Sequence, residues 1–208
     1  ALESPQSFAP AANPNPARFL RSYRTTSMAQ TIDYRRLLGR RVGDHRWTEE
    51  QRQYYLRGPD DPRYAELANR IVASLPPARR NDPFARALAV KLWLDHNATY
   101  STRERHAGVP DPTADFLFGN KIGYCVHFAH AAVYMWRALG IPARASTGYH
   151  FDEANRRGGS AILLRGNDGH AWPEIYFDGL GWIVLDIAAE KNLAPPGDPP
   201  DDDLQRML

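Results

Sequence analysis

The stretch Gly119–Arg144 reads GNKIGYCVHFAHAAVYMWRALGIPAR and decides the fold of this 208-residue chain. It contains Cys125, the only cysteine, at the point where glycines give way to an apolar run. The helical spacing of that run predicts a helix from Cys125 to Leu139, with Gly140 as its C-terminal glycine. Its apolar residues alternate between small and large, which is typical of a buried helix.

Two further helices are predicted before this stretch and several strands after it. Asp61 and Asp82 each precede a proline and an apolar segment of helical period, the pattern of an N-cap followed by proline in the first turn. A short helix around Asp33–Leu38 is a further option. Segments typical of strands lie at 143–150, 160–164, 170–177 and 181–186, and DGLG at 178–181 predicts a hairpin between the last two. Helices followed by an antiparallel sheet indicate an α+β fold.

Composition divides the chain into three parts. Residues 1–57 are a proline-rich lead-in and a basic extension, and the first 16 are expected to hold no packed element. Residues 58–193 hold the predicted core, and residues 194–208 form a tail rich in proline and aspartate. The arginines of the extension are interpreted as a solvated face, with a docking patch for an acidic surface as the alternative.

The bulk properties exclude several function classes. A net charge of +2 is too small to indicate nucleic-acid binding, and no apolar run reaches the roughly 18 residues of a membrane span. No signal peptide begins at Ala1, although the chain could be a mature fragment or a domain of a larger, membrane-anchored protein. One cysteine rules out an internal disulfide and leaves the compartment open.

Cys125 has the position of a nucleophile. The free N–H groups and partial positive charge of a helix N-terminus favour a thiolate and can hold an oxyanion. Such a nucleophile needs a base and an orienting acid, for which His170 and Asp186 are the candidates. With a turn of two to four residues they lie diagonally, about 7–8 Å apart between backbones, on one face if the register is right. Pro173 indicates that this part of the first strand lies at an edge or a bulge.

Other interpretations of these residues stay open at the level of sequence. Cys125 could be a small buried hydrophobe. A zinc site from Cys125, His127, His130 and His170 is disfavoured, because residues two apart on a helix point about 200° apart. Glu174 and Asp178 are rival orienting acids.

The motifs GYCVHFAHAAVYMWRALGIPARASTGY, HAWPEIYF and GWIVLD resemble the transglutaminase-like superfamily over roughly residues 60–190. The resemblance implies a papain-like, transglutaminase-like α+β core with a triad of Cys125, His170 and Asp186. It implies that the thiolate attacks a carboxamide of a protein or peptide, that ammonia leaves, and that an amine or water resolves the thioester. The backbone N–H of Cys125 is then one oxyanion donor, and Trp172 and Tyr124 wall the substrate site, with core packing as the alternative role of Trp172.

The resemblance also carries expectations about cofactors, location and rival functions. No cofactor or metal is implied, although the Asp201–Asp203 run leaves calcium as an option. Bacterial relatives of this kind imply a periplasmic or secreted location, with the cytoplasm as the alternative. Val126 after the cysteine, and Ile187–Ala188 after Asp186, depart from close relatives and leave donor and acceptor preference open. A cysteine peptidase or amidase on the same triad, and a non-catalytic scaffold domain, are the competing functions.

Overall fold

The computed structural model describes residues 5–13, 15–17, 20–27, 33–104, 106–149 and 168–187. Contacts between residues divide the chain into two units, residues 1–34 and residues 35–208. The predicted boundary between residues 57 and 58 followed composition alone, and the contacts group residues 35–57 with the larger unit. The predicted strand at 160–164 and the tail at 194–208 lie outside the described residues.

The smaller unit contains an antiparallel pair of strands, β1 (Pro5–Pro10) and β2 (Tyr23–Ser27). The rings of Phe8 and Tyr23 pack across the pair with their centroids 5.8 Å apart. The first 16 residues, which were expected to hold no packed element, therefore contain a strand. Prolines at both ends of β1 are compatible with a strand that has only one neighbour in this two-stranded sheet.

The larger unit is built on a three-stranded antiparallel sheet with the order β5–β6–β7. The strands are β5 (Ala143–Tyr149), β6 (Gly169–Phe177) and β7 (Gly181–Val184). A tight turn with positive φ at Gly179 joins the last two, as the hairpin prediction requires. A second, parallel pair joins β3 (Thr99–Tyr100) to β4 (Ile122–Gly123), the strand that leads into Cys125.

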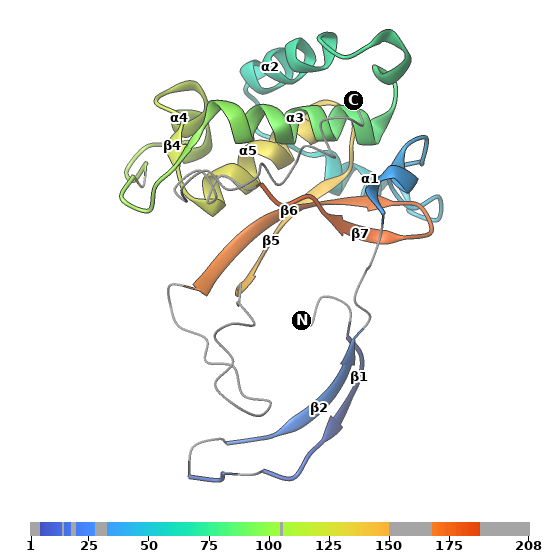
Figure 1. Cartoon of the computed structure of the whole chain (residues 1–208), viewed down its shortest axis with the longest axis vertical. Coiled ribbons are helices and arrows are strands. Elements are labelled where there is room, and N and C mark those ends of the chain that lie inside the picture. Colours follow the sequence, from blue (N-terminus) through green and yellow to red (C-terminus); the bar gives the residue numbers. More distant parts are fainter. Residues whose placement is uncertain are drawn as a thin grey trace. The chain divides into compact units, whose positions relative to one another are not determined.

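Helices gather on one face of this sheet (Figure 1). The first two of the predicted helices are α2 (Pro62–Ala73) and α3 (Pro83–Asn97). Their N-caps are Asp61 and Asp82, whose carboxylates accept backbone N–H groups of the first turn as the sequence predicted. Helices α1 (Glu49–Leu56) and α4 (Pro112–Phe118) are additional, and the option around Asp33–Leu38 is a 3-10 turn at Tyr34–Leu37. The α+β fold is confirmed.

Helix α5 (Cys125–Ala138) is the central helix of this unit. It is buried on most sides, and Trp136, fully buried, donates its indole N–H to the carbonyl of Ala87 in α3 at 3.0 Å. Gly140 has a φ of 76°, and the N–H of Ile141 returns to the carbonyl of Trp136 at 2.9 Å, which ends the helix in a Schellman motif. The chain then turns directly into β5, so one continuous segment spans the helix and the sheet.

Residues before α1 pack against the end of β6 that leads into the hairpin with β7. Val42 bridges Phe177, and the N–H of Gly43 donates to the carbonyl of Tyr176 at 2.8 Å. The ring of Trp47 packs at a tilt against that of Tyr176, with ring centroids 4.6 Å apart. None of the helices in the described ranges is long and apolar enough to span a membrane.

Candidate active site

Cys125 is the first residue of α5, with Tyr124 as the extended N-cap residue. The N–H groups of Cys125 and Val126 precede the first intrahelical bond, which the N–H of His127 makes to the carbonyl of Tyr124 at 2.8 Å. The thiol is half-buried. A partly accessible sulfur beside the first N–H groups of a helix, which make no backbone hydrogen bond within the described part of the chain, is the arrangement that the sequence predicted for a nucleophile.

The segment before Cys125 is fixed by close packing. A Cβ atom at Gly123 would lie 2.8 Å from the ring of Phe116 and 2.9 Å from Nδ1 of His127, so only glycine fits there. Nδ1 of His127 in turn accepts the backbone N–H of Tyr124 at 3.3 Å. The path of the chain into the nucleophile is therefore determined by contacts on both sides of it.

A second histidine supports the same segment from behind. His106 is buried, with Nδ1 2.6 Å from Oδ2 of Asp115 and Nε2 2.6 Å from the carbonyl of Ile122. Its ring stands edge-on to His127, with centroids 4.9 Å apart. Burial lowers the pKa of His106, but the hydrogen bonds to Asp115 and Ile122 together raise it by more. The pKa therefore lies above its usual value. His106 lies in a segment with no periodic pattern, so the sequence did not indicate a role for it.

His170 and Asp186 form a direct pair. Nε2 of His170 lies 2.9 Å from Oδ2 of Asp186, and Oδ1 of Asp186 accepts the N–H of Ile187 at 2.9 Å. Glu174 pairs with Val184, and this register continued along the strands sets Asp186 opposite Trp172, diagonal to His170. The diagonal placement is the one predicted from sequence.

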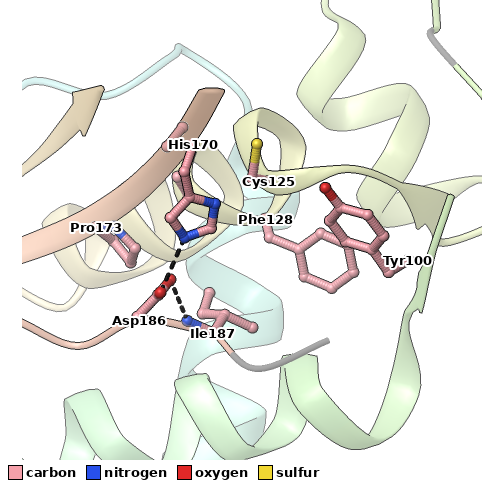
Figure 2. A pocket seen from close by; sticks show the side chains of 9 residues that line it. Tyr100, Cys125, Phe128, His170, Pro173, Asp186 and Ile187 are labelled. Carbon is pink, nitrogen blue, oxygen red and sulfur yellow. Dashed lines mark hydrogen bonds and ion pairs between the residues drawn. The ribbon is translucent and has the colours of Figure 1, made fainter. Parts of the chain in front are cut away.

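Cys125, His170 and Asp186 line one cavity (Figure 2). The other residues that line it are Tyr100, Phe128, Ala129, Ala171, Pro173 and Ile187. Figure 2 shows the ring nitrogen of His170 that does not face Asp186 turned to the side of Cys125. An imidazole that gives one N–H to a carboxylate presents its other nitrogen as a base.

Tyr100 stands on the other side of Cys125 from His170 (Figure 2). It ends β3, whose pairing with β4 brings it beside the strand that leads into the cysteine. No pattern in the sequence predicted this residue, because a parallel pairing of two residues across an intervening helix leaves no periodicity.

The two residues expected to wall the substrate site lie beside the cavity lining. Tyr124 packs edge-on against His127, with centroids 4.5 Å apart. Trp172 lies 5.9 Å from the ring of His170, covers Gly148 on β5, and donates its indole N–H to Oε1 of Glu174 at 2.9 Å. Their roles as walls stay predictions.

The rival acids are bound elsewhere. Buried Glu174 accepts the indole of Trp172 and the Nε–H of Arg144, 2.5 Å from its Oε2. Asp178 pairs with Nδ1 of His45 at 2.8 Å beside the hairpin turn. Of the three acids, Asp186 is the one that lies within hydrogen-bond distance of His170 among the described residues.

The zinc alternative finds no support in the described residues. Nδ1 of His127 faces the N–H of Tyr124, and Nδ1 of His130 faces the carbonyl of Val126 at 2.8 Å. Within the described ranges, the group of possible metal ligands whose atoms lie within 4.8 Å of one another is a different one, Asp44, His45 and Asp178. Bonds from Arg46 and Tyr176 occupy Asp44 and hold its pKa well below the usual range, so this group is an ion-pair cluster.

Comparisons with known proteins identify the family of this chain. Residues 66–187 match the family model described as the transglutaminase-like superfamily. The chain belongs to that superfamily. It is 36% identical over 104 residues to a protein-glutamine gamma-glutamyltransferase of Pseudomonas aeruginosa, and 37% identical over 111 residues to the uncharacterized protein YebA of Bacillus subtilis. Each match covers 50% of this chain and 15% of the relative.

A solved structure is similar as well. The crystal structure of the periplasmic domain of TgpA from Pseudomonas aeruginosa matches with a TM-score of 0.56 and 28% identity. The match covers 71% of this chain and 50% of that one. The fold is thus the α+β fold of this superfamily, as predicted, and this chain spans only a small part of the length of its curated relatives.

Proposed function

We propose that this domain is a thiol-dependent acyltransferase that acts on carboxamides of proteins or peptides, with Cys125 as nucleophile, His170 as base and Asp186 as orienting acid. The observation that carries the proposal is the 2.9 Å bond between His170 and Asp186 in a cavity that Cys125 also lines. Family membership and the transglutaminase relative support the same reaction class.

The chemistry follows from the order of the three side chains. His170 accepts the thiol proton on the nitrogen that faces Cys125, while the N–H of its other nitrogen stays hydrogen-bonded to Asp186. The thiolate attacks the carboxamide carbon, and the tetrahedral oxyanion forms beside the free N–H groups at the start of α5. The imidazolium then protonates the leaving ammonia, and a thioester of Cys125 remains.

The second half reverses the proton flow. A primary amine or water gives a proton to His170 as it attacks the thioester, and the thiol of Cys125 is restored as the new amide or acid leaves. Exclusion of water from the cavity favours the amine. Phe128, Ala171 and Ile187 supply an apolar lining of this kind.

Tyr100 is the proposed second oxyanion donor. Its ring lines the cavity on the far side of Cys125 from the base (Figure 2). A phenol hydroxyl in that position can donate to the oxygen that becomes negative in the transition state. A periplasmic or secreted location is part of the same proposal, and the periplasmic origin of the structural neighbour supports it.

The experiment that tests the proposal uses the full 208-residue chain with a glutamine-rich protein such as dimethylated casein and a dansylated primary amine. We expect incorporation of the amine and release of one ammonia for each amine, both abolished in Cys125→Ala. Ammonia release without incorporation would make water the second nucleophile, and hydrolysis of peptide bonds instead of side-chain amides would make the domain a peptidase. If neither ammonia release nor peptide-bond cleavage exceeds the background of Cys125→Ala, the acyl-transfer mechanism is rejected.

A further inference from the structure

A second cavity, of about 420 Å³, lies between α1, α5 and β5. Its polar lining consists of Tyr54, Tyr55, His130, Tyr134, Arg137 and Arg144, which we call the arginine–tyrosine pocket. No aspartate or glutamate lines it in the described part of the chain. A cavity rich in hydrogen-bond donors and free of acids is suited to an anionic group.

Arg137 provides a positive charge without a carboxylate partner in the described residues. Its Nε and one terminal nitrogen donate to the carbonyl of Ala143 at 3.0 and 2.8 Å, and the other terminal nitrogen donates to the carbonyl of Arg57 at 2.6 Å. A guanidinium has five N–H groups, so two remain. Burial lowers the pKa of Arg137, which expresses the cost of holding this charge away from water, and an anion would offset that cost.

The tyrosines add further donors. The hydroxyls of Tyr54, Tyr55 and Tyr134 form no hydrogen bond within the described part of the chain. Burial raises the pKa of Tyr134, so that its hydroxyl keeps its proton and can donate. By contrast, the charge of Arg144 is balanced by Glu174, so Arg137 is the cation that would attract a ligand.

The pocket lies a short distance from the nucleophile along both elements that form it. His130 is five residues after Cys125 on α5, an axial distance of about 7.5 Å. Ala145 also lines the pocket and lies three residues before Gly148, which pairs with His170, a distance of about 10 Å along β5. Measured along either element alone, each distance equals the length of two or three residues of extended peptide.

We propose that the arginine–tyrosine pocket is a specificity subsite that binds a carboxylate of the substrate, two or three residues from the reacting carboxamide. This assignment rests on the proposed function, because the ligand is taken to be a substrate of that reaction. Binding of the ligand can nevertheless be measured without turnover. The ligand is an acidic side chain or terminal carboxylate of a peptide, held by the two remaining N–H groups of Arg137 and by phenol hydroxyls.

The test measures peptide binding to the full chain carrying Cys125→Ala. The probes are acetylated, amidated alanine heptapeptides with a central glutamine and one glutamate moved through positions one to three on either side. We expect glutamate two or three residues from the glutamine, on one side only, to bind about tenfold tighter than alanine there. Arg137→Gln should remove this advantage and leave binding of the all-alanine peptide unchanged. The control is Arg63→Gln, which removes an arginine of α2 paired with Asp61 and should keep the advantage.

Because Arg137 also holds two backbone carbonyls, Arg137→Gln could weaken the fold, and the double variant Tyr54→Phe/Tyr134→Phe then decides. It removes only hydroxyls and should reduce the advantage at least threefold. The subsite is rejected if no glutamate position binds better than alanine, if the advantage survives in the double variant, or if inorganic phosphate binds as tightly as the best peptide. A preserved glutamate preference in a wild-type protein without turnover would leave the subsite standing and reject only the acyl-transfer function.

Discussion

Nε2 of His170 is held 2.9 Å from Oδ2 of Asp186, at a place where the ladder between β6 and β7 has just ended. The side chain of Asp186 is 47% exposed and that of His170 only 10%. The carboxylate therefore reaches from the surface to a nearly buried ring. This pair fixes which nitrogen of the imidazole faces Asp186, and the proposed mechanism assigns the other nitrogen to Cys125.

Replacement of Asp186 by asparagine should leave the fold intact and remove most of the activity. An amide can hold the ring but does not enforce the tautomer or stabilise the imidazolium, so we expect kcat to fall about a hundredfold or more. Since the carboxylate is half exposed, the free energy of unfolding should change by less than about 1 kcal/mol. Steady-state amine incorporation and thermal unfolding measure the two effects, and Asp178→Asn is the matched control. Full activity in Asp186→Asn would remove Asp186 from the triad.

Pro173 lies in the part of β6 that carries His170, and the sequence indicated that this part lies at an edge or a bulge. It pairs with Ala145 on β5, whereas the ladder between β6 and β7 covers only Glu174–Phe177, so this part of β6 has a strand neighbour on one side. The carbonyl of Pro173 accepts the N–H of Leu185 at 3.1 Å, whereas a proline nitrogen has no hydrogen to return. The ladder to β7 therefore loses a bond just before Asp186, which is compatible with the chain leaving the sheet there.

Replacement of Tyr100 by phenylalanine should lower kcat and leave KM nearly unchanged. Loss of one oxyanion donor typically costs about 10²–10³ in kcat, because the bond strengthens only in the transition state. Tyr23→Phe, which removes the hydroxyl of an exposed tyrosine on β2, is the control for amine incorporation on a neutral glutamine peptide. An unchanged kcat in Tyr100→Phe would mean that the ring of Tyr100 only lines the cavity.

Replacement of Gly123 by alanine should weaken both the fold and the site. The new Cβ would lie 2.8 Å from Phe116 and 2.9 Å from His127, and displacement of these rings should cost about 1–3 kcal/mol of unfolding free energy. Chemical denaturation measures this cost. Gly58→Ala is the control, since a Cβ there meets nothing within 4 Å and should change stability by less than about 0.5 kcal/mol. Equal stabilities of the two variants would contradict the tight packing at Gly123.

His106 should make stability depend on pH. Its pKa is raised in the folded protein by Asp115 and the carbonyl of Ile122, so its contribution is fully present below about pH 6.5, the usual value for histidine, and is lost as pH rises through the folded pKa. The variant His106→Asn tolerates the φ of 48° at this position and does not titrate.

Urea denaturation of the wild type and of His106→Asn at several pH values tests this. We expect the difference in unfolding free energy to be larger at pH 6 than at pH 9. Asp115→Asn should flatten the wild-type pH dependence in the same way, because it removes the carboxylate that holds the proton. A difference that grows with pH would show that the ring is neutral in the folded protein.

The sequence predicted those parts of the fold whose signals are local. The caps at Asp61 and Asp82, the glycine end of α5 and the hairpin before β7 each follow from a few adjacent residues. The same Asp-Pro signal precedes α4 at Asp111, but a helix of seven residues is too short to show a clear helical period. Helix α1 buries none of its residues, so it has no apolar stripe to find.

The parts of the site that escaped prediction depend on distant pairings. Tyr100 reaches the cavity through β3 and β4, which are two residues long each. The position of Arg137 depends on its hydrogen bonds to the carbonyls of Arg57 and Ala143, which only the folded chain brings near it. Such relations are set by the tertiary packing and leave no spacing in the sequence.

The measurement that tests the central claim most directly is the rate of Cys125 alkylation by iodoacetamide as a function of pH, in the wild type and in His170→Ala. If His170 accepts the thiol proton, the wild type should react at least about tenfold faster than His170→Ala at pH 6, and the two rates should converge above pH 9, where any thiol ionises. Equal rates of the two proteins at every pH would show that His170 does not act on Cys125, and the proposed triad would be wrong.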